Sequence, residues 1–315
     1  MSNDPRMKIN ALAERLRAGD PRALGRALTV VENGEGDALS LIEALSDEFG
    51  KAQIVGFTGP PGAGKSTLVD ALIHEWRAEG RPVAVLAVDP VSPVSGGALL
   101  GDRTRMGAHS LDAGVFIRSV SARGHLGGLC HAAHDMADIM DAAGWPLILI
   151  ETVGAGQSET EITQVADLCV VVSAPGLGDE LQAIKAGILE IGDLLVVNKA
   201  DREDANETVE HLESMLSLRS GAKRDVSVLR VSASTRSGVS RLKDEIDQLL
   251  QVAGATAGDD RKRKRDARKL ALAVQRVAGR ISAGIPDEGF SAMRPEELDR
   301  AITRSLASLS TENEG

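Results

Sequence analysis

Short apolar runs recur along the chain and predict buried β-strands. They cover residues 53–58, 82–89, 115–118, 146–151, 168–173, 193–197 and 228–233. Several runs are apolar at nearly every position, which is typical of parallel strands covered on both faces. Stretches with apolar residues at helical spacing separate the runs, as at 67–73 and 238–252. This alternation predicts an α/β fold in which helices cover a mostly parallel sheet.

Helical segments flank this alternating region. Residues 8–49 have apolar positions at helical spacing and predict two or three helices, broken at Asp20–Pro21 and at Asn33–Gly34. Residues 253–258, rich in alanine and glycine, are typical of a linker, and apolar-faced helices that we expect to form a subunit interface follow it. The predicted parts are an N-terminal helical segment at 1–50, a central domain at 51–252 and a C-terminal helical segment at 259–315.

Composition narrows the possible partners. The 315 residues carry a formal net charge of −10, which argues against a broad nucleic-acid-binding surface. We interpret the basic run at 261–265 as a solvated helix face. Two cysteines provide no disulfide framework, the first ten residues are polar, and no apolar run approaches a membrane span. We expect a soluble, cytoplasmic protein that binds neither nucleic acid nor membrane.

Candidate chemistry begins directly after the first predicted strand, with Gly-Pro-Pro-Gly-Ala-Gly-Lys-Ser at 59–66. This stretch fits the phosphate-binding loop G-x-x-x-x-G-K-[ST] in its required context, between a strand and a helix. Lys65 is expected to reach the β- and γ-phosphates, and the Ser66 hydroxyl to hold Mg²⁺. The sequence therefore predicts a nucleoside triphosphate site. The residues predicted to line it here are Gly62, Ala63, Gly64, Lys65, Ser66 and Thr67.

Two acids near this loop are further candidates for Mg²⁺ and for catalysis with Lys65. Asp89 ends a predicted strand, and Asp102 lies in a connection long enough to favour a functional loop. The alternatives are a strand-end carboxylate for Asp89 and a helix N-terminal acid for Asp102. We favour the functional interpretation of both acids because the phosphate loop is near.

Glu151, at the end of the strand at 146–151, has the form of the second nucleotide motif. In that motif a strand-end acid reaches Mg²⁺ through water, and a following glycine, here Gly154, meets the γ-phosphate. Ala155 stands where many GTPases carry a water-orienting glutamine, and Gln157 lies too far along to inherit that role simply. The sequence leaves open how the hydrolytic water is positioned.

The base is specified further along the chain. Asn198, Lys199 and Asp201 form Asn-Lys-x-Asp after the strand at 193–197. A carboxylate at Asp201 accepts hydrogen bonds from the guanine ring N–H and amine, which adenine does not match, and the Lys199 stem can lie along the base. Ser232 and Ala233 end the last predicted strand, where backbone N–H groups can meet the guanine carbonyl. These motifs in chain order predict GTP rather than ATP.

A segment after the strand at 168–173 holds Asp179, Gln182 and Lys185. Two interpretations stay open for it: a helix cap with a solvated face, or a mobile loop that senses the nucleotide.

Cys130, His131 and His134 lie close together at the start of a predicted helix. Zinc requires three or four ligands, and no second Cys/His cluster exists, so we set a metal site aside there.

Together these motifs resemble those of the MeaB/ArgK GTPases, chaperones of adenosylcobalamin-dependent methylmalonyl-CoA mutase and related acyl-CoA mutases. The similarity runs from about residue 54 to 233, and its most family-specific piece is Glu151 to Glu159. The matching stretches are 59–67, 88–90, 100–106, 124–128, 151–159, 178–185 and 198–201.

The resemblance implies a P-loop NTPase core, GTP or GDP with Mg²⁺ as ligands, and a mutase partner whose cofactor loading and protection follow the GTP state. It implies homodimers joined through C-terminal helices. It also implies that Asp89, Asp102 and Glu151 serve Mg²⁺, and that the segment from Asp179 to Lys185 is an extra switch. Pro175, just before that segment, departs from the family pattern and would stiffen the switch.

Two other functions compete with a mutase chaperone. A GTPase that assembles a nickel or other metallocentre shares the fold class but requires a His- or Cys-rich metal-carrying segment, and only the cluster at 130–134 offers anything similar. An ATP-dependent kinase requires an acceptor-binding base and tolerance for adenine, and Asp201 argues against the second.

Overall fold

The computed structural model describes residues 5–33, 37–89, 109, 111–121, 128–152, 158–177, 191–217 and 226–253. The chain divides into two compact units, Met1–Ala257 and Gly258–Gly315, and every described residue belongs to the first. The predicted C-terminal segment at 259–315 lies outside the described residues, so it stays a prediction.

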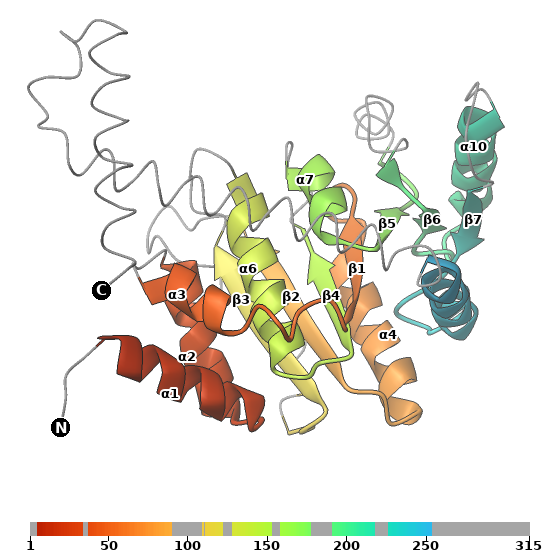
Figure 1. Cartoon of the computed structure of the whole chain (residues 1–315). Coiled ribbons are helices and arrows are strands. Elements are labelled where there is room, and N and C mark those ends of the chain that lie inside the picture. Colours follow the sequence, from red (N-terminus) through yellow and green to blue (C-terminus); the bar gives the residue numbers. More distant parts are fainter. Residues whose placement is uncertain are drawn as a thin grey trace, which may run out of the picture. The chain divides into compact units, whose positions relative to one another are not determined.

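In the described part of the chain, one seven-stranded parallel sheet forms the centre, with strand order β3-β2-β4-β1-β5-β6-β7 (Figure 1). The strands are β1 (Gln53–Thr58), β2 (Val83–Asp89), β3 (Val115–Ser121), β4 (Leu147–Glu151), β5 (Leu168–Ser173), β6 (Leu194–Val197) and β7 (Ser227–Arg230). The predicted α/β fold with a mostly parallel sheet is confirmed.

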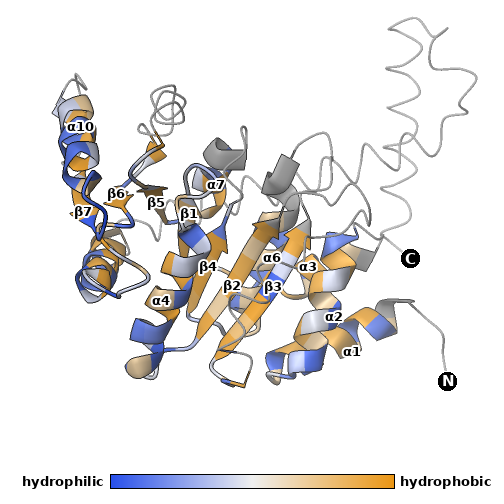
Figure 2. Cartoon of the chain, turned by 180° about the vertical axis from the view of Figure 1, so that it is seen from behind, coloured by the Kyte–Doolittle hydropathy of each residue, from blue (hydrophilic) through white to orange (hydrophobic). Residues whose placement is uncertain are grey.

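Helices cover both faces of this sheet, which explains why its strands are apolar throughout. On one face lie α4 (Lys65–Ala78) and the helix at 239–253. On the other lie α6 (Gly128–Ala142), α7 (Ser158–Val165) and α10 (Ala205–Ser217), as Figures 1 and 2 show from opposite sides.

The core between α4 and the sheet is mainly aliphatic, with two large aromatic side chains. Phe57 on β1 and Trp76 on α4 are fully buried, among Leu68, Leu72 and the inward-facing residues of β4 and β5. Burying one such side chain contributes about 1.5–3 kcal/mol. The core therefore fixes β1 against α4, and the phosphate loop connects these two elements.

Three N-terminal helices precede β1: α1 (Pro5–Arg17), α2 (Pro21–Glu32) and α3 (Asp37–Ala44). The predicted break at Asp20–Pro21 is the start of α2, where the Asp20 carboxylate accepts hydrogen bonds from the backbone N–H groups of Arg22 and Ala23. Helices α2 and α3 pack on α6, and Arg118 of β3 pairs with Glu32 of α2 at 2.5 Å. These helices thus cover the β3 side of the sheet.

Four strands begin one residue away from the prediction, namely β2, β4, β6 and β7, and two carboxyl-terminal ends differ by more. β3 continues to Ser121, beyond the predicted 115–118, because it pairs with β2 along its whole length, up to Asp89. The last strand ends at Arg230 rather than at 233. Beyond it the Ser232 N–H donates to the Ser237 carbonyl at 2.9 Å, in an isolated antiparallel bridge that turns the chain back.

Cys169 lies on β5 as a buried free thiol. Burial, and to a smaller extent the charge of Asp193, raises the pKa of this thiol to about 12. Because only the thiolate is reactive, the Cys169 side chain behaves at neutral pH as a small apolar core residue.

Among the described residues, no helix combines the length and the hydropathy that crossing a membrane requires.

Candidate nucleotide-binding site

The predicted site residues follow neighbouring strands. The phosphate loop follows β1, Glu151 ends β4, Asn198 follows β6, and Ser232 follows β7. Because all seven strands are parallel, their carboxyl ends meet at one edge of the sheet. Segments that are far apart in sequence are thereby brought to one place.

Two glycines make the phosphate loop possible. Gly59 has φ +132°, and a Cβ there would fall against the backbone carbonyl oxygen of Val172. Gly64 is the N-cap of α4 with φ +85°, and a Cβ there would lie 2.5 Å from Asn198 Nδ2. Both positions exclude larger residues by backbone conformation and by space. The loop is consequently packed against β5 and Asn198.

Lys65 begins α4 and turns back over the loop. Its Nζ donates to the carbonyls of Gly59 at 2.7 Å and Pro60 at 3.0 Å, and the residue is 6% exposed. The N-terminus of α4 adds the positive end of the helix dipole at the same place. A buried ammonium beside a helix N-terminus is an environment suited to an anion.

Ser66 and Glu151 meet across the sheet edge. The Ser66 hydroxyl donates to Glu151 Oε1 at 2.6 Å, and both residues are buried. Just beyond Glu151, the Thr152 hydroxyl donates to the Thr58 hydroxyl at 3.2 Å, and the Thr152 N–H donates to the Phe57 carbonyl at 3.0 Å. These contacts hold the ends of β1 and β4 together.

Asn198 connects the phosphate loop to the segment after β7. Its Nδ2 donates to the carbonyls of Ala63 at 2.9 Å and Gly64 at 3.2 Å, while its Oδ1 accepts from the Ala233 N–H at 3.1 Å. The residue is 2% exposed, so both ends of the amide are satisfied inside the protein. One side chain thus sets the spacing between the phosphate loop and the candidate base-recognition segment.

Lys199 adopts the left-handed backbone conformation, with φ +57°, which is uncommon outside glycine. Its Nζ donates to the Gly62 carbonyl at 2.8 Å, so the side chain stretches from the end of β6 to the phosphate loop. The aliphatic stem therefore spans the gap between the two motifs, where it can lie along a base.

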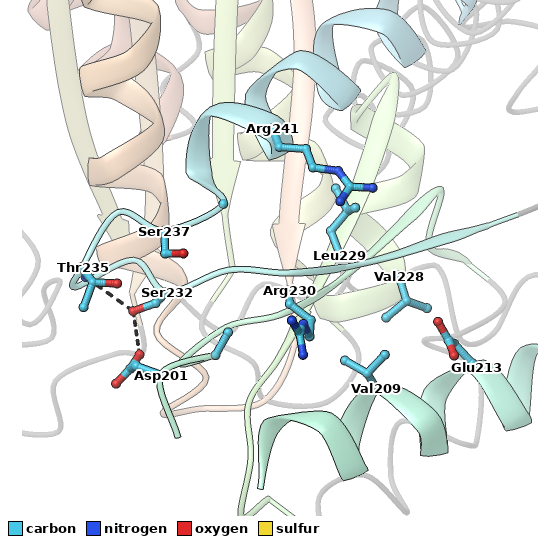
Figure 3. Close-up of a pocket in the computed structure, with 12 residues that line it drawn as sticks. Asp201, Val209, Glu213, Val228, Leu229, Arg230, Ser232, Thr235, Ser237 and Arg241 are labelled. Atoms are coloured by element: carbon cyan, nitrogen blue, oxygen red, sulfur yellow. Dashed lines mark hydrogen bonds between the residues drawn. The ribbon is translucent and has the colours of Figure 1, made fainter. Parts of the chain in front are cut away.

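Asp201 and Ser232 form a hydrogen-bonded pair (Figure 3). The Ser232 hydroxyl donates to Asp201 Oδ1 at 2.5 Å, and the Thr235 N–H donates to the Ser232 hydroxyl at 3.4 Å. This hydrogen bond from Ser232 is the main reason that the pKa of Asp201 lies below its ordinary value. Asp201 is therefore an ionised acceptor at neutral pH, and it is exposed to solvent.

The role of the Ser232 side chain was not foreseen from the sequence, which suggested only a backbone contact there. Its hydroxyl is aimed at Asp201 by the turn after β7, and the sequence offers no signal for that turn beyond three serines and a threonine at 232–237. The carboxylate is consequently held in place before any base is present.

A groove of about 510 Å³ lies beside this pair, between α10 and the helix at 239–253. The β7 residues Val228 and Arg230 line it, together with Glu213 and Arg241 from the two helices (Figure 3). Since Asp201 and Ser232 also border it, the groove adjoins the candidate base-recognition residues without containing the phosphate loop.

Several predicted site residues lie outside the described part of the structure. They are Asp102, Gly154, Asp179, Gln182 and Lys185. Asp89 ends β2 as predicted, but its side chain is outside the described set, as are those of Cys130 and His131. The roles given to these residues stay predictions.

Comparison with known proteins decides between the candidate families. A family model described as "Methylmalonyl Co-A mutase-associated GTPase MeaB" matches residues 24–285, which is more than half of the chain. The chain belongs to the MeaB family of GTPases. The resemblance seen in its motifs is thereby confirmed, and the protein is a P-loop GTPase that binds guanine nucleotide.

Relatives of this MeaB-family chain cover most of its length. A putative GTPase of Pyrococcus abyssi is 44% identical over 304 residues, which are 94% of this chain and 92% of that protein. A mitochondrial "methylmalonic aciduria type A homolog" of Caenorhabditis elegans is 34% identical over 287 residues, 85% of this chain and 71% of that protein. The crystal structure of an LAO/AO transport system kinase matches with a TM-score of 0.64 at 25% identity, over 98% of this chain and 99% of the other.

Proposed function

We propose that this GTPase is a nucleotide-dependent chaperone of an adenosylcobalamin-dependent acyl-CoA mutase of the methylmalonyl-CoA mutase type. The observation that carries the proposal is the family description, which names association with methylmalonyl-CoA mutase and matches residues 24–285. In this account the GTP state of the chain governs loading of the cofactor into the mutase and protection of the loaded enzyme.

The phosphates of GTP are expected to lie in the loop from Gly62 to Thr67. The backbone N–H groups at the start of α4 would donate to them, and the buried Lys65 ammonium would exchange its loop carbonyls for phosphate oxygens. Positioning and charge stabilisation account for most catalysis of phosphoryl transfer. Lys65 is therefore our principal catalytic candidate.

Mg²⁺ fits the residues beside this loop. Ser66 Oγ and Glu151 Oε1 lie 2.6 Å apart, and hydroxyl and carboxylate oxygens are the ligands that Mg²⁺ prefers. Asp89, at the end of the neighbouring β2, and Asp102 are the further candidates, and Gly154 would contact the γ-phosphate. When bound, the ion would neutralise charge on the β- and γ-phosphates.

Guanine is expected to lie against Lys199, with its ring N–H and amine donating to Asp201. The support for this is the Ser232 hydroxyl, which holds the Asp201 carboxylate in place, and the Asn198 amide, which holds Ala233 beside the phosphate loop. A site whose acceptor is fixed in this way discriminates strongly, because adenine would leave the carboxylate without donors.

Hydrolysis by the free protein is expected to be slow. The position after Gly154 is Ala155, so no glutamine orients water there, and the residues named above supply mainly charge. We propose that the partner orders the segment containing Asp179, Gln182 and Lys185 and so completes the site. In this proposal the segment switches the GTPase from slow to fast hydrolysis when the partner binds.

The alternatives predict different partners. A GTPase that assembles a nickel or other metallocentre would bind a metalloenzyme, and a kinase would transfer phosphate from ATP to an acceptor. The kinase activity in the name of the solved LAO/AO transport system kinase is said of that protein and is not assigned to this chain. For this chain the Asn-Lys-x-Asp sequence at 198–201 favours GTP over ATP.

Capture of the partner tests the proposed function. The tagged full chain, loaded with a non-hydrolysable GTP analogue, is expected to retain an acyl-CoA mutase from an extract of its own cells, identified by mass spectrometry. The phosphate-loop variant Lys65→Ala, which cannot load nucleotide normally, serves as the control. Retention of a nickel or other metalloenzyme instead of a mutase would favour the alternative.

We also propose that residues 259–315 form a homodimer interface, because their apolar helix faces have no place in a finished central domain. The mass in solution of the full chain is expected to be that of a dimer at micromolar concentration, and truncation after Gly258 is expected to give a monomer. A full chain that is already monomeric would remove this proposal.

A further inference from the structure

A short segment before β3 runs alongside α4, the helix that begins at the phosphate loop. Arg77 of α4 donates two hydrogen bonds to Asp112, at 2.8 and 2.9 Å, and Asp112 also accepts from the Gly114 N–H at 2.8 Å. A Cβ at Gly114 would meet the Arg77 guanidinium. These hydrogen bonds hold the carboxyl-terminal half of α4 against this segment.

A second contact lies nearer to the phosphate end of α4. His109 Nε2 lies 3.2 Å from Asp70 Oδ1, and the His109 ring packs edge-on against His74 with centroids 6.4 Å apart. Both polar atoms are shielded from solvent, and neither makes a hydrogen bond within the described residues. A buried polar atom without a hydrogen bond is costly, and a polar group within contact distance lessens that cost. The two groups therefore depend on each other.

The spacing along α4 links this contact to the proposed Mg²⁺ site. Ser66, Asp70 and His74 are four residues apart, so they lie one above the other on one face of the helix. Asp112 contacts Arg77 near the carboxyl end of α4, whereas His109 contacts Asp70, which is closer to Ser66. Asp102, another Mg²⁺ candidate, lies only seven positions before His109 in the sequence.

Other polar contacts of α4 hold its far end. Trp76 donates to Asp247, Lys243 pairs with Glu79, and Arg81, just past the helix, also donates to Asp247. They are about three to four turns away from Ser66, whereas Asp70 is about one turn away. Site residues displaced by a fraction of an ångström lose much of their function. Apart from the contacts of Lys65 and Ser66 themselves, the contact of Asp70 with His109 is the polar contact nearest to the metal-binding turn among those described for α4, so it is well placed to control that turn.

We infer that the contact between His109 and Asp70 is a positioning device for the metal-binding end of α4, and that it sets the Mg²⁺ dependence of the GTPase without touching the nucleotide. The inference rests on the proposed role of Ser66 in holding Mg²⁺. Asp70 and His109 act through the helix and are positioning residues rather than catalytic ones.

The test is the Mg²⁺ concentration that gives half-maximal GTP hydrolysis by the full chain. Asp70→Asn removes the carboxylate charge and is expected to raise that concentration about tenfold. This is the smaller of the losses in metal affinity that follow when groups supporting metal ligands are replaced. Affinity for GDP in the presence of EDTA is expected to stay at the parent value. His109→Gln removes the partner group and is expected to act in the same direction.

Two variants serve as controls. Asp70→Glu retains the carboxylate and is expected to restore Mg²⁺ dependence close to that of the parent. Asp112→Asn breaks the ion pair with Arg77 farther along α4, and is expected to lower the melting temperature without changing the Mg²⁺ requirement.

Two results would overturn the inference alone. One is a parent-like Mg²⁺ requirement in both Asp70→Asn and His109→Gln, and the other is an equal shift in Asp112→Asn. A parent protein that hydrolyses GTP equally well without Mg²⁺ would instead remove the proposed metal role, and the inference with it.

Discussion

Replacement of Asp201 by asparagine is expected to exchange GTP for xanthosine triphosphate as the preferred nucleotide. The Asp201 carboxylate, held by the Ser232 hydroxyl at 2.5 Å, is the proposed acceptor for the guanine ring N–H and amine. Asparagine presents an N–H where the carboxylate presented an oxygen, and xanthine presents a carbonyl where guanine presents its amine. Loss of such a match costs about 10⁴-fold in discrimination.

Dissociation constants for fluorescent GTP and xanthosine triphosphate measure this exchange directly. Asp204→Asn is the matched control, because Asp204 is a nearby, partly exposed acid that pairs with Arg202 at 3.4 Å and has no proposed contact with the base. The control is expected to keep parent selectivity. If Asp201→Asn still binds and hydrolyses GTP as the parent does, base recognition lies elsewhere.

Replacement of Lys65 by alanine is expected to lower kcat/KM for GTP by about 10²–10³-fold, the usual effect of removing one preorganised donor to developing charge. The ammonium is buried at the start of α4 and is held by two loop carbonyls, so it is aimed into the phosphate loop before nucleotide arrives. No other lysine among the described residues begins a helix in this way.

Steady-state hydrolysis with a fixed excess of Mg²⁺ measures this loss. Lys51→Ala is the control, since Lys51 is an exposed lysine just before β1 and is expected to leave the rate unchanged. Thermal melting of both variants separates a folding defect from a catalytic one. A Lys65→Ala rate within a factor of about two of the parent would contradict the assigned role.

The sheet was predictable because each of its strands is a self-contained signal. β1 and β5 begin and end at the predicted residues. Each is a mainly apolar run, and such a run is stable as a strand only where both of its faces are buried. The end of β7 was not predictable, because it depends on the bridge between Ser232 and Ser237, which the apolar pattern does not encode.

The local motifs of the site were readable in the same way, but their connections were not. The sequence indicates a phosphate loop and Asn-Lys-x-Asp as separate strings. Only the fold shows that Asn198 donates to Ala63 and Gly64, 135 and 134 positions away. The contact between His109 and Asp70 likewise has no local signature. The functional roles of the individual residues stay predictions until they are measured.

The N-terminal helices illustrate the same division. Their breaks follow from Asp20–Pro21 and Asn33, which cap α2 at its two ends. Their packing on α6, and the ion pair of Glu32 with Arg118, depend on a surface assembled from distant segments. Local chemistry places such helices along the chain, whereas tertiary contacts decide what they cover.

The central claim, that a partner mutase completes this GTPase, is tested most directly by GTP turnover of the full chain measured with and without a saturating adenosylcobalamin-dependent acyl-CoA mutase. Slow turnover alone and faster turnover with the mutase are predicted, because Ala155 replaces the water-orienting glutamine and the switch segment must be ordered. Lys185→Ala is predicted to keep the basal rate and lose the stimulation. A mutase that leaves the parent rate unchanged would contradict the account.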